Sequence, residues 1–571
     1  MHSSFPARPS ALLKRAFLLG FAVAPLGVAF AQAQPPRGDP GLELQRRQEQ
    51  TLDAQRERAN QRPDVFGGAD PQGAQAAIFP AEQPCFAIER LAWEGDSPPR
   101  SLEVLADAAL GRCLGVQGLR LLQERMTQSL VAEGRVTARV LLPEQSLARG
   151  QLRLRYVSGR ISAVRSENAA GSWRTVLPTW PGGEINQRDL DQALENIRRL
   201  AGQSDASIDV VPGPELGESD VLIKPGTGKR WHGYAGGDNG GIKSISRYQM
   251  NAGLTLDSPL FLYDQLSVSW NSNANRGSRD VGSRAASINY SIPFGYWTLF
   301  AGASKSRYRQ TVAGFDAPIV YAGKSKQIEA GVSVVPYRGT TYKGNLSAKL
   351  YRKRSDSTIN DYAIDVQRRD VVGYDISYNH RHYVDQAAID VGGGVRNTLP
   401  YYSDAPGYVF DDPHWNGRST VLVGNAALYL PFKLGMQSLA FQSALSWQHA
   451  KTSVLPADYF TIGNRYAVRG FNGEMTLAAE SGWSVRNDLS LNLGNTGQQL
   501  YTGLDVGRVS GAAARYLAGQ TLVGAVAGFR GRVPMPHLQG SYDLSLGWPL
   551  KKPDNIKTDS TTVAFTLMFD F

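Results

Sequence analysis

The sequence has no apolar run long enough to cross a membrane as a helix. A spanning helix needs about 20 consecutive apolar residues, and no segment after the first 34 residues comes close to that length. The apolar stretch at residues 16–30 is too short, and Gly20, Pro25 and Gly27 interrupt it. A transmembrane helix is therefore excluded.

The first residues instead have the parts of a secretory signal. Positive charge comes from Arg8, Lys14 and Arg15, and the short apolar stretch follows them. Ala31-Gln32-Ala33 then offers small residues for cleavage before Gln34. We therefore predict that residues 1–33 are a signal peptide and that the mature protein is exported.

Cysteine is scarce, because the 571 residues include only Cys85 and Cys113. In an exported chain, an even and low count predicts one disulfide, here between these two residues. Closing a loop of that size contributes on the order of 3 kcal/mol in the chain-entropy model. We expect no metal site at these cysteines, since no histidine or further cysteine lies near them in the sequence.

No segment concentrates charge of one sign. The net charge is +10 and the sequence pI is about 9.4, yet the 61 Lys and Arg are spread along the chain among 51 Asp and Glu. A groove for nucleic acid needs a run of basic residues with interleaved aromatic residues. The sequence has no such run, so we predict no nucleic-acid partner.

Signatures of enzymes are lacking as well. The sequence has neither a His-Glu-x-x-His nor a Gly-x-Ser-x-Gly motif. Gly392-Gly393-Gly394 is not placed between a strand and a helix, as a phosphate-binding loop would be, and predicts a crowded or kinked strand. We predict a protein that is not an enzyme and that holds no cofactor and no metal.

After the signal, a polar segment precedes the first folded module. Residues 41–61 are rich in Gln, Arg and Glu, and Leu42, Leu44 and Leu52 form no apolar stripe. A helix that is polar on all sides is either unstable or surrounded by water, so a solvated tail stays open as an alternative. We assign residues 34–61 to this polar helix and residues 62–84, rich in Pro, Gly and Ala, to a linker.

Two short segments then repeat one order of elements. Residues 85–157 have the pattern strand, helix, helix, strand, strand, and residues 158–226 repeat that order. Two strands close each segment: they are expected at residues 136–142 and 151–157 in the first segment, and at 207–212 and 220–224 in the second. Two consecutive copies predict tandem α/β modules, each small enough to be only marginally stable alone.

The remainder, residues 227–571, alternates apolar and polar residues in segments of about ten residues. One example is Leu489-Ser490-Leu491-Asn492-Leu493, and the chain ends on Phe571 after a similar segment. A soluble β-sandwich would alternate in the same way. Export, aromatic residues near strand ends and the final aromatic strand favour a transmembrane β-barrel.

The strand number can be estimated from the length. Dividing residues 231–571 among 16 strands allots about 21 residues to each strand with its connection, which fits short turns on one side and long loops on the other. Fourteen or eighteen strands fit nearly as well.

Within this region, His380-Arg381-His382 puts two imidazoles on one strand face with no evident third ligand, so we expect them in the barrel interior or a loop.

A loop motif stands out inside the barrel region. Val468-Arg469-Gly470-Phe471 places an arginine before a glycine-aromatic pair, and Gly473 follows. Because glycine adopts backbone angles that other residues resist, these positions suit a tightly folded loop. We interpret Arg469 as a charge that the loop carries to a fixed target.

Together these features resemble the TpsB transporters of two-partner secretion, of the haemolysin or haemagglutinin secretion/activation type. The residues that carry the resemblance are Asp458-Tyr459-Phe460-Thr461-Ile462-Gly463-Asn464-Arg465-Tyr466 before the loop motif, Asp257-Ser258-Pro259-Leu260 with Asp264-Gln265-Leu266, Tyr290-Ser291-Ile292-Pro293-Phe294-Gly295-Tyr296-Trp297, and Cys85-Phe86-Ala87-Ile88. The resemblance covers nearly the whole mature chain. It implies a 16-stranded barrel, a polar helix plugging the pore, and two periplasmic POTRA (polypeptide-transport-associated) modules.

The resemblance also implies a partner for Arg469. In that family the loop arginine pairs with a wall aspartate in a Gly-x-Asp-x-Gly-like strand, which here is Gly503-Leu504-Asp505-Val506-Gly507. Strand alternation puts Asp505, Gly503 and Gly507 on one face. Two glycines beside the carboxylate leave room for a bidentate guanidinium. The alternative is that a Lys or Arg of a neighbouring strand satisfies Asp505.

The implied function is secretion across the outer membrane of a Gram-negative bacterium. A large, unfolded, β-rich exoprotein of the TpsA type would bind the POTRA modules and leave through the barrel. The predicted edges at residues 136–142 and 207–212 are candidates for adding a strand of that partner. Alternatives are a BamA-like insertase, which usually has more POTRA modules and no plug helix, a passive porin, which needs no modules, and a barrel-embedded hydrolase.

Overall fold

The computed structural model describes residues 79–571, except 168–170, 244, 276–280, 313–317, 537 and a few positions between 405 and 413. The predicted signal peptide at residues 1–33, the polar helix at 34–61 and most of the linker at 62–84 lie outside the described residues. No helix in the described part of the chain is long and apolar enough to cross a membrane.

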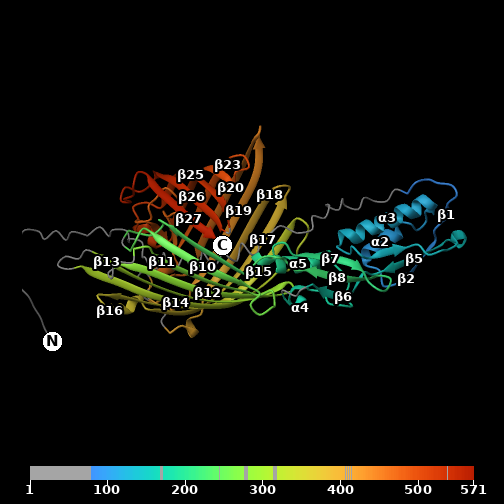
Figure 1. Ribbon diagram of the computed structural model, residues 1–571, viewed down its shortest axis with the longest axis horizontal. Helices are drawn as coiled ribbons and strands as arrows, with labels where there is room; N and C mark the ends of the chain where they lie inside the picture. The colour runs from blue at the N-terminus through green and yellow to red at the C-terminus, as the bar shows by residue number, and fades with distance from the viewer. Residues whose placement is uncertain are drawn as a thin grey trace, which may run out of the picture. The chain divides into compact units, whose positions relative to one another are not determined.

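The first module packs two helices against one small sheet (Figure 1). Its elements are β1 (Phe86–Ala87), β2 (Arg90–Gly95), α2 (Arg100–Asp107), β3 (Cys113–Leu114), α3 (Val116–Ala132), β4 (Arg139–Leu141) and β5 (Gln151–Val157). The sheet order is β2-β5-β4, with β2 parallel and β4 antiparallel to β5. On α3, Leu122, Met126 and Leu130 recur at intervals of four, so they form one buried stripe.

The predicted disulfide is confirmed beside this sheet. Cys85 and Cys113 are joined, with their Cα atoms 5.3 Å apart and 28 positions apart in the chain. Close to this bond, the Glu82 carboxylate accepts hydrogen bonds from the backbone N–H groups of Gly115, Gln117 and Gly118 at 2.7–2.9 Å. These groups lie at the N-terminal end of α3, where backbone donors lack partners within the helix. The end of the linker is thereby fixed to the first module.

The second module repeats the plan with a shorter first helix. Its elements are β6 (Arg160–Ser166), α4 (Trp173–Val176), α5 (Gln187–Arg198), β7 (Ser207–Pro212) and β8 (Glu218–Lys224), with sheet order β6-β8-β7. The Asn186 side chain caps α5 by accepting from the N–H of Arg188 at 2.8 Å. In both modules the predicted late strand, β4 or β7, lies at a sheet edge.

Polar contacts join the two modules at Ser158. The Asp96 carboxylate accepts from the backbone N–H of Ser158 at 2.9 Å and from its hydroxyl, and Arg160 lies 3.6 Å away. The hydroxyl and amide of Ser158 favour the ionised form and lower the pKa of Asp96. Arg135 and Glu184 form a further ion pair between the modules.

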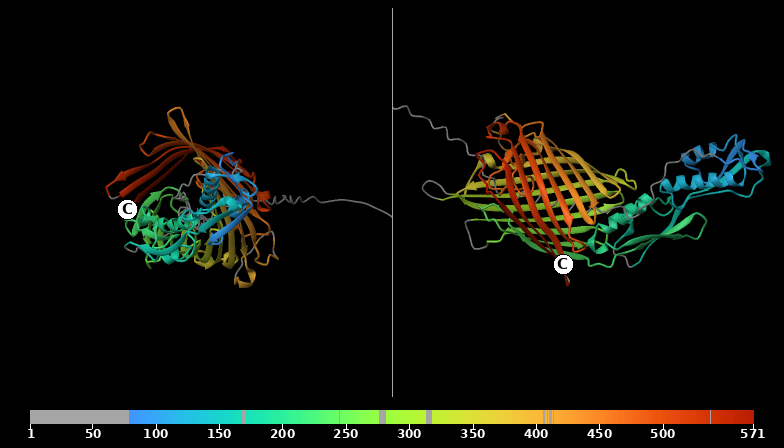
Figure 2. Two further views of the ribbon diagram at one scale, coloured as in Figure 1. Left: turned by 90° about the vertical axis from the view of Figure 1, so that its right-hand side faces the viewer. Right: turned by 90° about the horizontal axis from the view of Figure 1, so that it is seen from above.

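Sixteen long antiparallel strands of the described chain close into a barrel, so the predicted fold class is confirmed (Figure 2). They are β9 (Trp231–Asp238), β10 (Gln249–Asp257), β11 (Gln265–Asn273), β12 (Gly282–Phe294), β13 (Trp297–Val312), β14 (Ile319–Val334), β15 (Tyr342–Ile359), β17 (Arg369–Val384), β18 (Ala387–Thr398), β19 (Thr420–Leu434), β20 (Gln437–Ala450), β23 (Ser481–Asn492), β24 (Gln498–Ser510), β25 (Thr521–Met535), β26 (Leu538–Lys551) and β27 (Thr562–Asp570). A short strand, β16 (Tyr362–Ala363), pairs antiparallel with the end of β15. The barrel closes where β27 pairs with β9.

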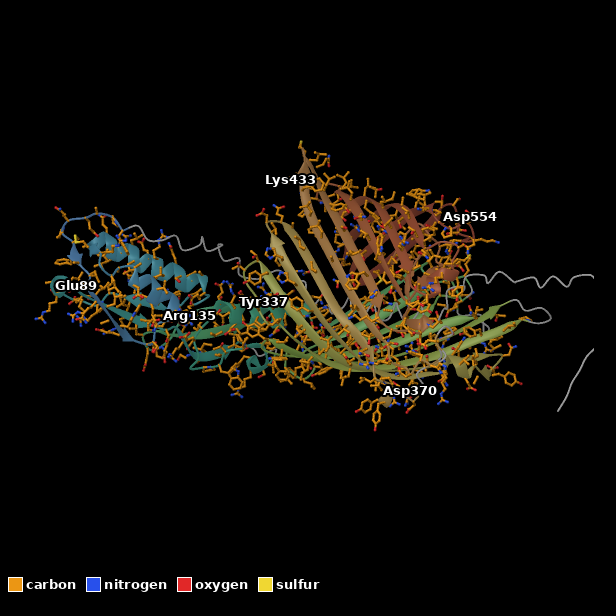
Figure 3. The ribbon with its side chains drawn as sticks, turned by 180° about the vertical axis from the view of Figure 1, so that it is seen from behind. Glu89, Arg135, Tyr337, Asp370, Lys433 and Asp554 are labelled. Carbon is orange, nitrogen blue, oxygen red and sulfur yellow. A yellow bond between two sulfur atoms is a disulfide. The ribbon has the colours of Figure 1, made fainter. Side chains whose placement is uncertain are left out.

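Alternating side chains give this barrel a polar interior and an apolar exterior. On β27, Val563, Leu567 and Phe569 are exposed to the outside, as alternation predicts. Short turns join the strands at one end, and longer connections lie at the other. Lys433 lies at the tip of the short-turned hairpin of β19 and β20 (Figure 3).

The His380-Arg381-His382 segment differs from the prediction. His380 and His382 pair in register with Val391 and Ile389, which are exposed on the outer wall. Arg381 takes the inner side, where it binds Asp390 at 2.6 Å. Because neighbouring strand residues alternate, the two imidazoles point outward, and the predicted position in the barrel interior or a loop is corrected.

Candidate functional site

The candidate site is the connection between β20 and β23, residues 451–480, which folds back against the inner wall of the barrel. Within it, β21 (Phe460–Ile462) pairs with β22 (Leu477–Ala479). Gly463, Gly470 and Gly473 have φ values of 95°, 94° and 76°, which residues with a Cβ atom rarely adopt. These glycines let the chain reverse tightly at the predicted positions.

Arg469 contacts Asp505 as a bidentate pair. Its Nε donates to Oδ2 and its Nη2 to Oδ1, both at 2.7 Å. The backbone N–H of Arg469 also donates to Oδ2 at 2.9 Å. Asp505 is fully buried and the Arg469 side chain is 11 % exposed, so little water competes for these charges. Such charge-assisted hydrogen bonds are about twice as strong as neutral ones.

A second carboxylate, Asp488 on β23, completes the arginine site. It accepts from Nη2 of Arg469 at 2.6 Å. Sequence reasoning did not identify this residue. The signal was present in the alternation of β23, because Leu489 and Leu491 face outward and Asp488 therefore faces inward. In register, Asp488 lies opposite Gly503, one of the glycines beside Asp505.

Glycines on three neighbouring strands make room for the loop. A Cβ at Gly503 would lie 2.7 Å from Nη2 of Arg469, and one at Gly507 would lie 2.8 Å from Cγ2 of Val468. On β25, a Cβ at Gly524 would collide with the carbonyl oxygen of Arg469. On β26, a Cβ at Gly547 would lie 2.9 Å from Cα of Gly470. The loop thus lies directly on the backbone of β24, β25 and β26.

Apolar contacts hold the other two motif residues. Val468 is fully buried and Phe471 nearly so, within a cluster at the wall. The other buried members of this cluster are Ile462, Leu477, Ala479, Val509, Ala514, Leu522 and Ile556. All four predicted motif residues therefore contribute to docking of the loop. Arg469 does so through its charge, Gly470 through its close backbone contact, and Val468 and Phe471 through their buried side chains.

A second set of contacts joins α5 of the second module to the short turns of the barrel. Glu195 on α5 accepts from Arg338 at 3.1 Å and also pairs with Lys343. Asn196 donates to the carbonyl oxygen of Gly295 at 2.7 Å, and Arg199 donates to the Ser291 hydroxyl at 2.9 Å. A cavity of about 350 Å³ lies between these polar residues of α5 and the inner wall. Helix α5 thus lines one side of a polar cavity.

No group of three or more His, Cys, Asp or Glu side chains in the described residues is arranged to hold a metal ion. The contacts at the site are hydrogen bonds and ion pairs between protein groups. These contacts hold the loop against the inner wall.

The fold and this site define a class. A closed antiparallel barrel with an apolar outer wall, a docked inner loop and two modules before it is an outer-membrane transporter of the POTRA-bearing kind. Residues 217–531 match the family described as haemolysin secretion/activation protein ShlB/FhaC/HecB. Residues 86–159 match a ShlB-type POTRA domain, and residues 160–212 match a POTRA domain.

The chain belongs to this haemolysin secretion/activation family. It is 33 % identical over 568 residues to the outer membrane transporter CdiB-2 of Burkholderia pseudomallei strain 1026b, covering 95 % of this chain and 97 % of that protein. It is 26 % identical over 438 residues to the hemolysin transporter protein ShlB of Serratia marcescens, covering 76 % and 77 %. The solved structure of CdiB from Escherichia coli matches with a TM-score of 0.82 at 24 % identity, covering 94 % of this chain and all of that one.

The comparisons confirm the predicted family, localisation and function. The protein is an outer-membrane transporter of a Gram-negative bacterium, and it secretes a partner exoprotein. The insertase and porin alternatives are not favoured, because family and fold both match the secretion transporters.

Proposed function

We propose that the protein exports one large, β-rich exoprotein that arrives unfolded at the modules and leaves through the barrel. The observation that carries this proposal is the docked loop. Arg469 binds two wall carboxylates, and this arrangement can be released and re-formed without covalent change. A pore that opens for a chain and closes behind it needs such a reversible contact.

The domain boundaries belong to the same proposal. We infer a signal peptide at residues 1–33, a plug helix at 34–61, a linker at 62–84, modules at 85–157 and 158–226, and the barrel at 227–571. A helix that is polar on all sides is suited to a water-filled pore. The plug and the Arg469 loop would share the interior at rest.

Deletion of residues 41–61 tests the plug. Planar-bilayer conductance of the purified full chain should rise after the deletion, because a polar helix no longer blocks the pore. Conductance equal to that of the unaltered protein would contradict the plug and favour a permanently open channel.

The sheet edges of the modules are the proposed receptor for the partner. An extended chain that pairs with β7 would form backbone hydrogen bonds whatever its side chains are. Val211 on β7 is an exposed apolar residue at this edge. A photo-cross-linking residue at Val211 should capture the exoprotein during secretion.

A matched position provides the control for this experiment. Trp180 is an exposed apolar residue of the same module and lies outside its sheet. The same cross-linker at Trp180 should capture much less exoprotein than at Val211. Equal capture at both positions would contradict recognition through the β7 edge.

A further inference from the structure

The loop that carries Arg469 also carries Arg465, and this second arginine reaches a different part of the wall. Its Nη1 donates to Oδ1 of Asp238 at 3.2 Å, and its Nη2 donates to the Thr566 hydroxyl at 3.1 Å. Asp238 is the last residue of β9, and Thr566 belongs to β27. One guanidinium therefore joins the first and last strands of the barrel.

These two strands form the weakest pairing in the wall. Five residue pairs join β27 to β9, from Thr566 with Asp238 to Asp570 with Tyr234. By contrast, eight pairs join β9 to β10 and sixteen join β13 to β14. Since every second pair of an antiparallel ladder exchanges backbone hydrogen bonds, the seam with the fewest pairs has the least main-chain support among the long strands of the described barrel.

Arg465 lies at the end of the seam where the regular ladder of β9 and β27 ends. Asp238 and Thr566 are themselves the terminal register pair. Beyond them, Asn239 makes three more contacts with the last strand. Its backbone N–H donates to the carbonyl oxygen of Phe565 at 3.4 Å, its side-chain amide donates to the carbonyl oxygen of Val563 at 2.8 Å, and its side-chain oxygen accepts from the N–H of Phe565 at 2.9 Å. Charge-assisted bonds at such a fraying end oppose separation of the strands more than bonds in the middle of a ladder would.

The surroundings hold the guanidinium in this position. The Arg465 side chain is 23 % exposed and that of Asp238 is 12 % exposed, so the pair is partly shielded from water. A Cβ at Gly240 would lie 2.5 Å from Nη1 and 2.6 Å from Cδ of Arg465. The backbone of Gly240 thus packs directly against the arginine, in space that only glycine leaves open.

We propose that Arg465 is a clip that makes the stability of the seam depend on docking of the loop. Arg469 anchors the loop to β23 and β24, while Arg465, four positions earlier, binds β27 and β9. Release of the loop from the wall withdraws both guanidinium groups together. The seam is therefore strongest when the loop is docked and loosens when a passing chain displaces it.

Hydrogen–deuterium exchange on the full-length protein, without any exoprotein, tests the clip. In Arg465→Ala, amides of residues 233–239 and 563–571 should exchange about tenfold faster, because their opening no longer breaks bonds to a charged group. Thr566→Val removes one of the two acceptors and should give a smaller increase at the same residues. Arg465→Lys should fall between Arg465→Ala and the unaltered protein.

Arg381→Ala is the matched control, because it removes an inner-wall arginine whose carboxylate partner, Asp390, lies on β18. It should speed exchange near β17 and β18 and leave the seam unchanged. If neither Arg465→Ala nor Thr566→Val speeds exchange at the seam, the clip does not exist. Uniform acceleration around the whole barrel would also overturn it. If Arg465→Ala does not assemble, Thr566→Val alone decides the outcome, and secretion plays no part in this readout.

Discussion

Replacing Arg469 with alanine removes the group that joins the loop to β23 and β24. The fully buried Asp505 would keep one hydrogen bond, from the backbone N–H at position 469, and Arg486 would remain 4.0 Å away. Asp488 would lose its contact at 2.6 Å. The sixteen-stranded backbone ladder is untouched by this change, so insertion of the barrel should be normal.

The magnitude follows from burial and from the contacts that remain. Removing one partner of a buried ion pair generally costs about 3–5 kcal/mol. Because the N–H bond and Arg486 still compensate Asp505, we expect the lower end, about 3 kcal/mol of docking free energy. That value corresponds to roughly a hundredfold rise in the undocked fraction of the loop.

A buried thiol measures this fraction directly. Val468 is fully buried, and the two native cysteines are joined in a disulfide, so Val468→Cys introduces a single thiol that reacts only when the loop leaves the wall. In a Val468→Cys background, Arg469→Ala should speed maleimide labelling roughly a hundredfold and reduce secretion. Arg469→Lys should have an intermediate effect, since an ammonium cannot form the bidentate pair.

The control variant is again Arg381→Ala, which should leave labelling unchanged. Heat-modifiable migration on a gel should be normal in all variants, which shows that each barrel is folded. The reasoning is refuted if Arg469→Ala and Asp505→Asn both label at the unaltered rate and secrete normally.

Three further predictions concern the modules. Glu195→Gln leaves Arg338 and Lys343 without their shared buried carboxylate. The contact between α5 and the barrel should therefore weaken by about 3 kcal/mol. Proteases should then cleave the chain faster between residues 199 and 231. Loss of the Cys85–Cys113 bond in Cys85→Ser/Cys113→Ser, which closes a span of 28 positions, should destabilise the first module by about 3–4 kcal/mol in the chain-entropy model, seen as a lower Tm; an unchanged Tm would contradict it. The pKa of Asp96 is lowered in the folded protein. Its contribution to stability is therefore present above the unfolded pKa of about 4 and is lost as the pH falls through the folded pKa. Calorimetry from pH 6 to pH 3 should show a loss of module stability, and Asp96→Asn should make that loss smaller.

The part of the site that could be predicted is the part that strand phase determines. The period of two places Asp505, Gly503 and Gly507 on one face whatever the register of the sheet, and the glycines of the loop predict a tight reversal. In the structure this face is the one that receives Arg469. The alternation of strand residues and the local backbone preference of glycine can both be inferred from a single stretch of sequence.

The part that could not be predicted depends on register between strands. Asp488 lies beside Asp505 only because β23 and β24 pair with Asp488 opposite Gly503. Gly524 and Gly547 look like ordinary strand glycines until β25 and β26 are aligned under the loop. Arg465 was part of the recognised motif, yet its partners are more than 90 positions away in sequence at both ends of the barrel.

Length could not decide the strand number, and composition could not decide the direction of the two histidines. Fourteen, sixteen and eighteen strands divided the chain almost equally well, because strands of eight to eighteen residues alternate with connections of very unequal length. For His380 and His382, the deciding fact is that Arg381 between them binds Asp390 across the ladder. The contact between Arg381 and Asp390 thus shows which way all three residues point.

The row of glycines beneath the loop has a consequence for how the barrel is assembled. A slip of one residue in β25 would turn Gly524 outward and bring a neighbouring side chain under the carbonyl of Arg469. The same slip in β26 would replace Gly547 with Leu546 or Trp548. The loop can therefore settle only after three strands have paired in their native alignment. Docking of the loop is therefore a late step of folding, and it can occur only in a barrel whose strands have paired in the correct register.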